Sequence, residues 1–168
     1  HVAGIAALLW SANPTWTFSD LKQRLISTSQ PVQSLRTKVM AKGRVNAYNA
    51  YHNIVPPSQE PDEKLWKDVS RVVESDHPYK VSSEQVFTIN YPGAKFIRVH
   101  FEKIDFEEGY DFVMVESGTR EIVESFTGKK SDFTSDYLVG DTAVIHIKSD
   151  ESAVGFGFKI DRIQVITE

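Results

Sequence analysis

The chain has 168 residues, of which 40% are hydrophobic and 25% charged, as in ordinary soluble globular proteins. It contains no cysteine, which excludes disulfides, zinc-thiolate sites and thiol nucleophiles, and no apolar run approaches the roughly 18 residues that span a bilayer. Residues 1–55 carry six Lys and Arg against one Asp, whereas residues 56–168 carry thirteen basic and twenty-two acidic residues. This asymmetry indicates two separate units, and the acidic second unit argues against a nucleic-acid partner, because phosphate binding depends on clustered Lys and Arg.

The first ten residues are predicted to form a helix that is apolar or small on every side. A helix without a polar face belongs inside a larger domain, surrounded by other elements. Asn13-Pro14 ends this helix, because proline disfavours helical geometry in the residue before it. A section of about 55 residues buries only a marginal core, so too little chain follows to enclose the helix.

A second helix is predicted to start after Thr17 and to run to about Thr28. Thr17 is a good N-cap residue, and Asp20, three residues further on, completes a pair like a capping box. The apolar residues that follow recur at helical spacing, so this helix has one buried face. Residues 43–51 are predicted to form a short final helix.

Four features of this section resemble, in their order, the C-terminal end of the catalytic domain of a subtilisin-like serine protease. They are a His-Val-Ala-Gly sequence opening an Ala/Leu helix (residues 1–10), Asn13-Pro14, an amphipathic helix ending in Ser27-Thr28, and a Gly-Arg-Val-Asn-Ala sequence (residues 43–47). The resemblance covers about the first 53 residues. In that family the nucleophilic serine sits just upstream of the His-Val-Ala-Gly stretch, and the catalytic aspartate and histidine lie far earlier. No residue of the triad is therefore present, and His1 corresponds to a packing residue.

This resemblance implies that residues 1–54 are the incomplete C-terminal helices of a catalytic domain in a secreted or cell-surface endopeptidase. The parent would cleave peptide bonds through an acyl-enzyme on serine. This chain alone is expected to have no catalytic residue and no peptidase activity, and its partner would be the missing upstream catalytic domain. An alternative is that the section is only a proteolytic remnant.

Residues 55–66 are predicted to form a linker, because they are rich in proline and charge and poor in residues to bury. Residues 67–168 then show short strands with turn signals about every eight to twelve residues, which predicts an antiparallel β-sandwich or jelly roll. The predicted strands are residues 69–74, 85–90, 95–101, 111–116, 121–126, 143–148 and 158–166. The fold class predicted for the whole chain is α+β in two parts, a helical segment and a β-sandwich.

Two acidic turns stand out in the second section, residues 106–111 (Phe-Glu-Glu-Gly-Tyr-Asp) and residues 149–152 (Ser-Asp-Glu-Ser). Each adjoins an apolar strand, so folding is expected to place Asp150 beside Asp111 and Glu107. Clustered carboxylates without thiolate or imidazole favour a hard ion such as calcium over zinc. Two other interpretations stay open: the first turn is only a solvated loop, or Asp111 is satisfied by hydrogen bonds from turn amides.

The same turns belong to a series of motifs that resembles a CUB domain in order and spacing. The series is Phe-Xaa-Xaa-Ile-Asp-Phe-Glu (101–107), Tyr-Asp-Phe-Val (110–113), Phe-Thr-Gly (126–128), Ser-Asp-Glu-Ser (149–152) and Gly-Phe (157–158). In calcium-binding members, a glutamate ending the first segment, the aspartate after the tyrosine and the aspartate of the Ser-Asp turn hold the ion. The resemblance therefore implies Glu107, Asp111 and Asp150 as calcium ligands.

The sequence departs from the usual CUB pattern in two ways: it has no disulfides, and the gap between Glu107 and Asp111 is short. The short gap leaves Glu108 or Asp105 as alternatives for the first ligand. The resemblance implies an accessory domain that binds a protein substrate or cell-surface protein, or stabilises the catalytic domain, with calcium ordering the contact loop. The alternative is a free-standing adhesion or carbohydrate-binding module whose helical start is only a cap.

The sequence gives weaker support to other kinds of functional site. The five histidines show no His-Glu-Xaa-Xaa-His spacing, and His100 and His146 are predicted to be solvent-exposed on polar strand faces. Ser117-Gly118-Thr119 is predicted to be a hairpin turn rather than a nucleophile elbow. Six aromatic residues could line a carbohydrate platform, although core packing explains most of them: Trp66, Tyr79, Tyr91, Tyr110, Phe156 and Phe158.

Overall fold

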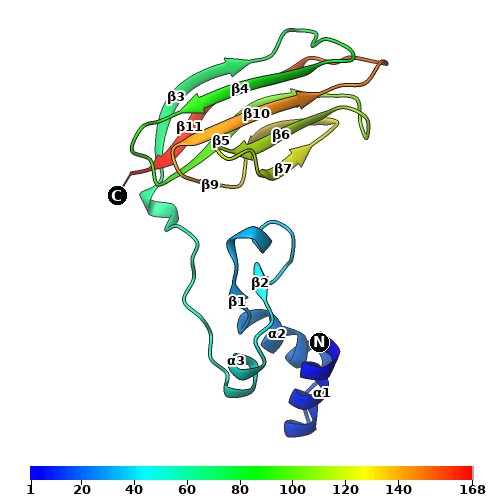
Figure 1. Cartoon of the computed structure of the whole chain (residues 1–168), viewed down its shortest axis with the longest axis vertical. Coiled ribbons are helices and arrows are strands. Elements are labelled where there is room, and N and C mark those ends of the chain that lie inside the picture. Colours follow the sequence, from blue (N-terminus) through cyan, green and yellow to red (C-terminus); the bar gives the residue numbers. More distant parts are fainter. Residues whose placement is uncertain (168) are drawn as a thin grey trace. The chain divides into compact units, whose positions relative to one another are not determined.

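The structure is a computed structural model that describes residues 1–167. The chain divides into two compact units, His1–Pro61 and Asp62–Glu168, and the division falls inside the predicted linker. Figure 1 shows helices in the first unit and a β-sandwich in the second. Among the described residues, no helix is long and apolar enough to cross a membrane.

The N-terminal unit contains three α-helices and one short strand pair. The helices are α1 (Val2–Ala12), α2 (Phe18–Ser27) and α3 (Ala47–His52), and a 3-10 helix spans Gln33–Leu35. Strand β1 (Gln30–Pro31) pairs antiparallel with β2 (Gly43–Arg44). Helix α1 ends where the sequence predicts, at Asn13, whose side-chain Nδ2 donates a hydrogen bond to the Leu9 carbonyl over 3.0 Å.

The capping box predicted at the start of α2 is confirmed. The Thr17 hydroxyl accepts a hydrogen bond from the Asp20 backbone N–H (3.2 Å), and the Asp20 carboxylate accepts one from the Thr17 backbone N–H (2.8 Å). The Thr17 hydroxyl also lies 2.6 Å from Asp20 Oδ2 and donates to it. This bond, together with that from the Thr17 backbone N–H, lowers the pKa of Asp20 below its ordinary value, because both favour the charged carboxylate. Two of the free amides at the helix start are thereby satisfied locally.

The helix predicted over residues 43–51 begins four residues later, so that prediction is wrong in its first half. Gly43 lies in β2, and a Cβ atom there would sit 2.2 Å from the backbone oxygen of Gln30. The glycine therefore serves the close strand pairing, not a helix. Helix α3 starts after Asn46, whose side-chain oxygen accepts a hydrogen bond from the Asn49 N–H.

The core of the N-terminal unit is small. Among the described residues, its buried hydrophobic cluster consists of Leu9, Leu21 and Ala50, with four partly buried apolar residues around them. Helix α1 stays largely uncovered: Val2 is 55% exposed and Trp10 is 43% exposed. The described residues therefore do not enclose this apolar helix, as the sequence predicts.

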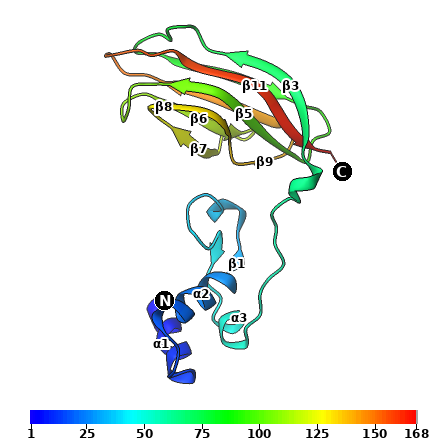
Figure 2. The same ribbon diagram turned by 180° about the vertical axis from the view of Figure 1, so that it is seen from behind.

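The second unit is an antiparallel sandwich whose two sheets face each other (Figures 1 and 2). One sheet has the order β4-β10-β6-β7 and the other β3-β11-β5-β8, with β9 pairing β5. The strands are β3 (Lys67–Glu74), β4 (Glu84–Asn90), β5 (Phe96–Asp105), β6 (Phe112–Ser117), β7 (Ile122–Phe126), β8 (Lys129–Thr134), β9 (Leu138–Val139), β10 (Thr142–Lys148) and β11 (Gly157–Ile166). A 3-10 helix spans Glu63–Leu65.

The inward-facing residues of both sheets form one core. In β5, Ile97, Val99 and Phe101 are fully buried and point inward, while Arg98 points the other way, as strand alternation predicts. Aromatic rings join the layers: Phe101 of β5 lies edge-to-face with Phe126 of β7 in the other sheet, with ring centroids 6.0 Å apart. This core holds the strand ends that carry the acidic turns.

All seven predicted strands are present, and the Ser117-Gly118-Thr119 turn joins β6 to β7 as predicted. Within the described part of the sandwich, β8 and β9 are the two strands that the sequence does not predict. β8 is exposed at every position except Phe133 and begins Lys-Lys-Ser-Asp, so it shows no apolar alternation. It forms because its backbone pairs with β5, which a residue pattern does not reveal.

Candidate metal centre

The acidic turns meet at one end of the sandwich because of the strand register. Asp111 immediately precedes β6, and Asp150 lies two residues beyond the end of β10. These two strands pair antiparallel, with Lys148 opposite Phe112, so the end of one lies beside the start of the other. Glu107 lies two residues after β5, in the turn that leads into β6.

The structure brings the three sequence-predicted ligands together. Glu107, Asp111 and Asp150 each offer a carboxylate oxygen, and these oxygens all lie within 4.8 Å of one another. The alternative Asp105 is engaged elsewhere, because its carboxylate lies 3.2 Å from the Lys129 ammonium. The alternative Glu108 is exposed and does not belong to the group.

Asp111 is the buried member of the cluster, with no exposed surface. One of its carboxylate oxygens accepts a hydrogen bond from the backbone N–H of Asp150 (2.8 Å), and the other accepts one from the Tyr79 hydroxyl. A buried carboxylate is costly unless its oxygens are satisfied, so these donors fix its position and direction. A turn amide does satisfy Asp111 in part, as one alternative interpretation holds, and that same amide ties it to the second acidic turn.

Tyr79 supports the cluster from below, and sequence reasoning assigns it only to packing or to a sugar platform. It is 1% exposed, and its hydroxyl accepts a hydrogen bond from the Glu107 backbone N–H (3.3 Å) while donating to Asp111. Burial, with help from the bond to Asp111, raises the pKa of Tyr79 to about 12. The phenol therefore keeps its proton and remains a donor at neutral pH. It lies 32 residues before Asp111 in the chain, so no local spacing signals this role.

Ser152 links the two partly buried carboxylates, Glu107 and Asp150. Its hydroxyl lies 2.6 Å from Glu107 Oε2 and 2.7 Å from Asp150 Oδ1, and its backbone N–H donates to the same Asp150 oxygen (2.8 Å). The bonds from Ser152 lower the pKa of Asp150, because they favour its charged form. Asp150 therefore carries a charged carboxylate at neutral pH.

The donor set fits a hard cation. Within residues 1–167, no Lys, Arg or His forms an ion pair with Glu107, Asp111 or Asp150, so like charges stand together without a protein counter-ion. All the side-chain ligands are oxygen atoms, which calcium prefers. The backbone is also tied down, since the Glu107 carbonyl accepts hydrogen bonds from the Asp111 N–H (3.1 Å) and the Thr127 hydroxyl (3.0 Å).

A cavity of about 550 Å³ opens beside Glu107. Its lining includes the acidic Asp105 and Glu108 together with Phe106 and Val154. Val154 is 39% exposed, so an apolar wall adjoins the acidic rim.

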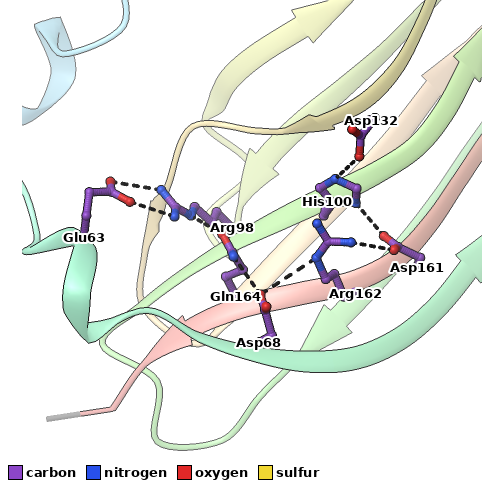
Figure 3. Close-up of polar contacts among 8 residues, drawn as sticks. All are labelled: Glu63, Asp68, Arg98, His100, Asp132, Asp161, Arg162 and Gln164. Carbon is purple, nitrogen blue, oxygen red and sulfur yellow. Dashed lines mark hydrogen bonds and ion pairs between the residues drawn. The ribbon is translucent and has the colours of Figure 1, made fainter.

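The predicted exposure of the two strand histidines is wrong. His100 is 4% exposed, with Nδ1 2.6 Å from Asp161 Oδ1 and Nε2 3.3 Å from Asp132 Oδ1 (Figure 3). His146 is partly buried, with Nδ1 2.8 Å from Glu116 Oε1. Both lie on outward faces, as predicted, but acidic side chains of neighbouring strands contact them and reduce their exposure. Neither joins a converging set of three metal ligands among the residues described.

The six aromatic candidates for a sugar platform do not form one surface. Tyr79 and Phe158 are buried in the core at 1% and 0% exposure. Phe156 is stacked on His77, with centroids 3.6 Å apart. Tyr110, at 65% exposure, is the most open of the six. Core packing accounts for three of the six, Tyr79, Tyr91 and Phe158, which is fewer than predicted.

The second unit is an antiparallel sandwich with a carboxylate cluster at one end. A family model identifies the family to which such a unit belongs. The model of the CUB domain matches residues 63–161. The chain therefore belongs to the CUB domain family, a family whose members occur in extracellular proteins and mediate protein interactions. The match confirms the predicted CUB fold and does not include residues 1–62.

Individual proteins show more limited likeness. The human E3 ubiquitin-protein ligase HERC2 is 34% identical over 91 residues, which are 52% of this chain and 2% of that protein. The CUB1-EGF-CUB2 region of human MASP-1/3 is 19% identical and covers 62% of this chain and 42% of its own, with a TM-score of 0.49. A MASP-1 CUB2 domain bound to Ca²⁺ is 24% identical and covers 56% of this chain and 89% of its own, with a TM-score of 0.44.

Proposed function

We propose that the CUB unit binds a calcium ion through Glu107, Asp111 and Asp150. The observation that carries this proposal is the fully buried Asp111 carboxylate, held by Tyr79 and set beside two further carboxylates without a protein counter-ion. A bound cation would neutralise the cluster and join the turn after β5 to the turn after β10. The ordered turns would then present the adjacent acidic cavity to a protein partner, such as a protein substrate or cell-surface protein.

Thermal unfolding of the full chain with and without calcium tests the site. An ion bound only by the folded state raises stability by about 2.7 kcal/mol at a concentration 100 times its dissociation constant, so we expect the sandwich to melt several degrees higher in calcium. Asp111→Ala and Asp150→Ala should each abolish that rise. Magnesium should stabilise less, because it requires a smaller and more regular ligand shell.

Glu151→Gln is the matched control, since Glu151 lies in the same acidic turn but outside the cluster. This variant should retain the calcium-dependent rise. Calorimetric titration with calcium gives the binding directly, and Asp150→Ala serves if loss of the buried Asp111 carboxylate prevents folding. An unchanged melting curve and no binding heat in millimolar calcium would exclude a calcium site.

For the N-terminal unit we propose the C-terminal end of a subtilisin-like catalytic domain, with the CUB unit as its non-catalytic accessory domain in a secreted endopeptidase. Two features support this: the motif order in residues 1–53, and the exposure of α1, whose apolar side chains need more protein to cover them. Under this proposal the triad lies upstream, so this chain alone is inactive.

The coding sequence upstream of His1 tests this second proposal. We expect it to supply Gly-Thr-Ser-Met-Ala-Xaa-Pro or a close variant, which would place the nucleophilic serine at the start of α1. An in-frame start codon immediately before His1, without such a sequence, would instead favour a free-standing binding module. This outcome is independent of the calcium titration, so either proposal can fail alone.

A further inference from the structure

Residues 62–66, the leading segment, belong to the sandwich although the sequence assigns them to the linker. The segment forms its own turn: the Asp62 carboxylate accepts a hydrogen bond from the Lys64 N–H (3.0 Å), and the Asp62 carbonyl accepts one from the Leu65 N–H (3.0 Å). Such a short 3-10 turn is weak by itself. Contacts with the outer face of the β3-β11-β5-β8 sheet must hold it in place.

Arg98 on β5 provides these contacts. Its two terminal nitrogens donate to both carboxylate oxygens of Glu63, at 3.2 and 2.9 Å, and its Nε donates to Gln164 Oε1 at 2.6 Å (Figure 3). The guanidinium carbon lies 4.2 Å from the centroid of the Trp66 ring. One side chain therefore contacts both ends of the turn and the strand β11 beneath it.

Arg98 is held by more than its ion pair. Its side chain is only 19% exposed, whereas that of Glu63 is 74% exposed, so the packing of the guanidinium contributes beside the charge contact. Trp66 packs on Tyr137 (centroids 6.4 Å apart), which is 5% exposed and packs in turn on Phe96 (5.4 Å). A flat, forked guanidinium can stack and donate along several directions at once, which a lysine ammonium cannot reproduce.

Gln164, the side chain beneath Arg98, is itself held by a hydrogen bond. Gln164 Nε2 donates to Asp68 Oδ1 at 2.7 Å, and Asp68 lies on β3, the strand that directly follows the leading segment. Figure 3 shows Glu63, Arg98, Gln164 and Asp68 in one continuous series of contacts. The start of β3 and the leading segment are therefore attached to the same face by neighbouring side chains.

We propose that Arg98 clamps the leading segment onto the sheet and thereby keeps residues 62–66 out of the connection between the two units. Release of the clamp would add five residues to that connection, or about 17 Å of extended chain. The length of a tether sets the effective concentration of one unit at the other's partner, so Arg98 acts as a positioning residue for the whole sandwich. The proposal does not depend on the calcium site or on the identity of the N-terminal unit.

Limited trypsin digestion of the full chain, followed by mass spectrometry, tests the clamp at the bond after Lys64. Cleavage follows the population of opened segment, so we expect Arg98→Ala to raise the rate at this bond about tenfold. Arg98→Lys should raise it nearly as much, because the charge remains but the fork and the flat stacking face are lost. Glu63→Gln, which removes only the ion pair, should raise it about two- to threefold.

Arg71→Ala is the matched control, because Arg71 lies exposed on the neighbouring strand β3 and makes none of these contacts. It should leave the cleavage rate within about twofold of the unchanged chain, and the urea midpoint of each variant verifies that the sandwich remains folded. Equal rates for Arg98→Ala and Arg71→Ala in folded protein would overturn the proposal. If Arg98→Ala does not fold, unchanged cleavage in Glu63→Gln would overturn it.

Discussion

The two units differ in how much apolar surface each encloses. The sandwich buries eighteen hydrophobic residues in one core drawn from both sheets, whereas the N-terminal unit fully encloses three. Because apolar burial is the main favourable term in folding, the sandwich has within itself what it needs to stay folded. The N-terminal unit depends more on local devices, such as the capping box of α2, and on whatever covers α1. The CUB family model matches the sandwich and not the N-terminal unit.

The largest expected effect comes from the sandwich core. Phe101→Ala removes a fully buried ring that stacks on Phe133, and we expect a loss of about 3–5 kcal/mol in the free energy of unfolding. Urea unfolding followed by circular dichroism measures it. The control Val72→Ala, at a position 64% exposed on β3, should change stability by less than about 0.5 kcal/mol. Equal losses of unfolding free energy in the two variants would contradict the view that the buried core stabilises the sandwich.

A smaller effect is expected at the support of the acidic cluster. Tyr79→Phe leaves the buried Asp111 carboxylate with one donor fewer, which should cost about 1–3 kcal/mol and weaken calcium binding. Tyr110→Phe is the control, because Tyr110 is 65% exposed. If both variants unfold at the same urea concentration and bind calcium alike, Tyr79 is only a packing residue.

The pH dependence of the stability of Tyr79→Phe gives a second test of the Tyr79 hydroxyl. The folded-state pKa of Tyr79 is raised to about 12 from the ordinary value of 10.0, so the folded chain holds this proton more tightly than the unfolded chain. The resulting stability is fully present below pH 10 and is lost as the pH rises from about 10 to 12. We expect the difference in unfolding free energy between the unchanged chain and Tyr79→Phe to narrow over that interval. A constant difference would contradict the raised pKa.

The smallest effect is expected in the N-terminal unit. Thr17→Ala removes the N-cap of α2 and should cost about 1 kcal/mol of local stability. Hydrogen exchange at the α2 amides should then be about fivefold faster, while exchange in the sandwich is unchanged. Ser19→Ala, at an exposed position of the same helix, is the control. Faster exchange in the sandwich as well would show that the two units are energetically coupled.

Local patterns in the sequence predict much of this structure. Short-range spacing predicts the strands with apolar alternation and the capping box at Thr17 and Asp20. Family motifs predict the three clustered carboxylates. Strand β8 does not, because its polar residues face solvent and its pairing with β5 is a property of the backbone. The role of Gly43 is also not predicted by local patterns, because this glycine allows a close approach to Gln30, thirteen residues away in the chain.

Two side-chain environments also lie beyond the sequence. Alternation places His100 on the outward face correctly, but the side chains of Asp132 and Asp161 cover it, and these come from other strands. Tyr79 reaches Asp111 only through the folded arrangement of the two sheets. In both cases the decisive neighbour is far away in the chain, so no periodicity records it.

The pairing of Lys148 with Phe112 joins segments 36 residues apart in the chain, and it places Asp150 beside Asp111. A cation that needs both carboxylates finds its ligands only when these strands have already met. Such an ion would leave the rate of folding nearly unchanged and slow the rate of unfolding. The lifetime of the folded sandwich would then vary with the calcium content of its surroundings, being shortest where the ion is scarce.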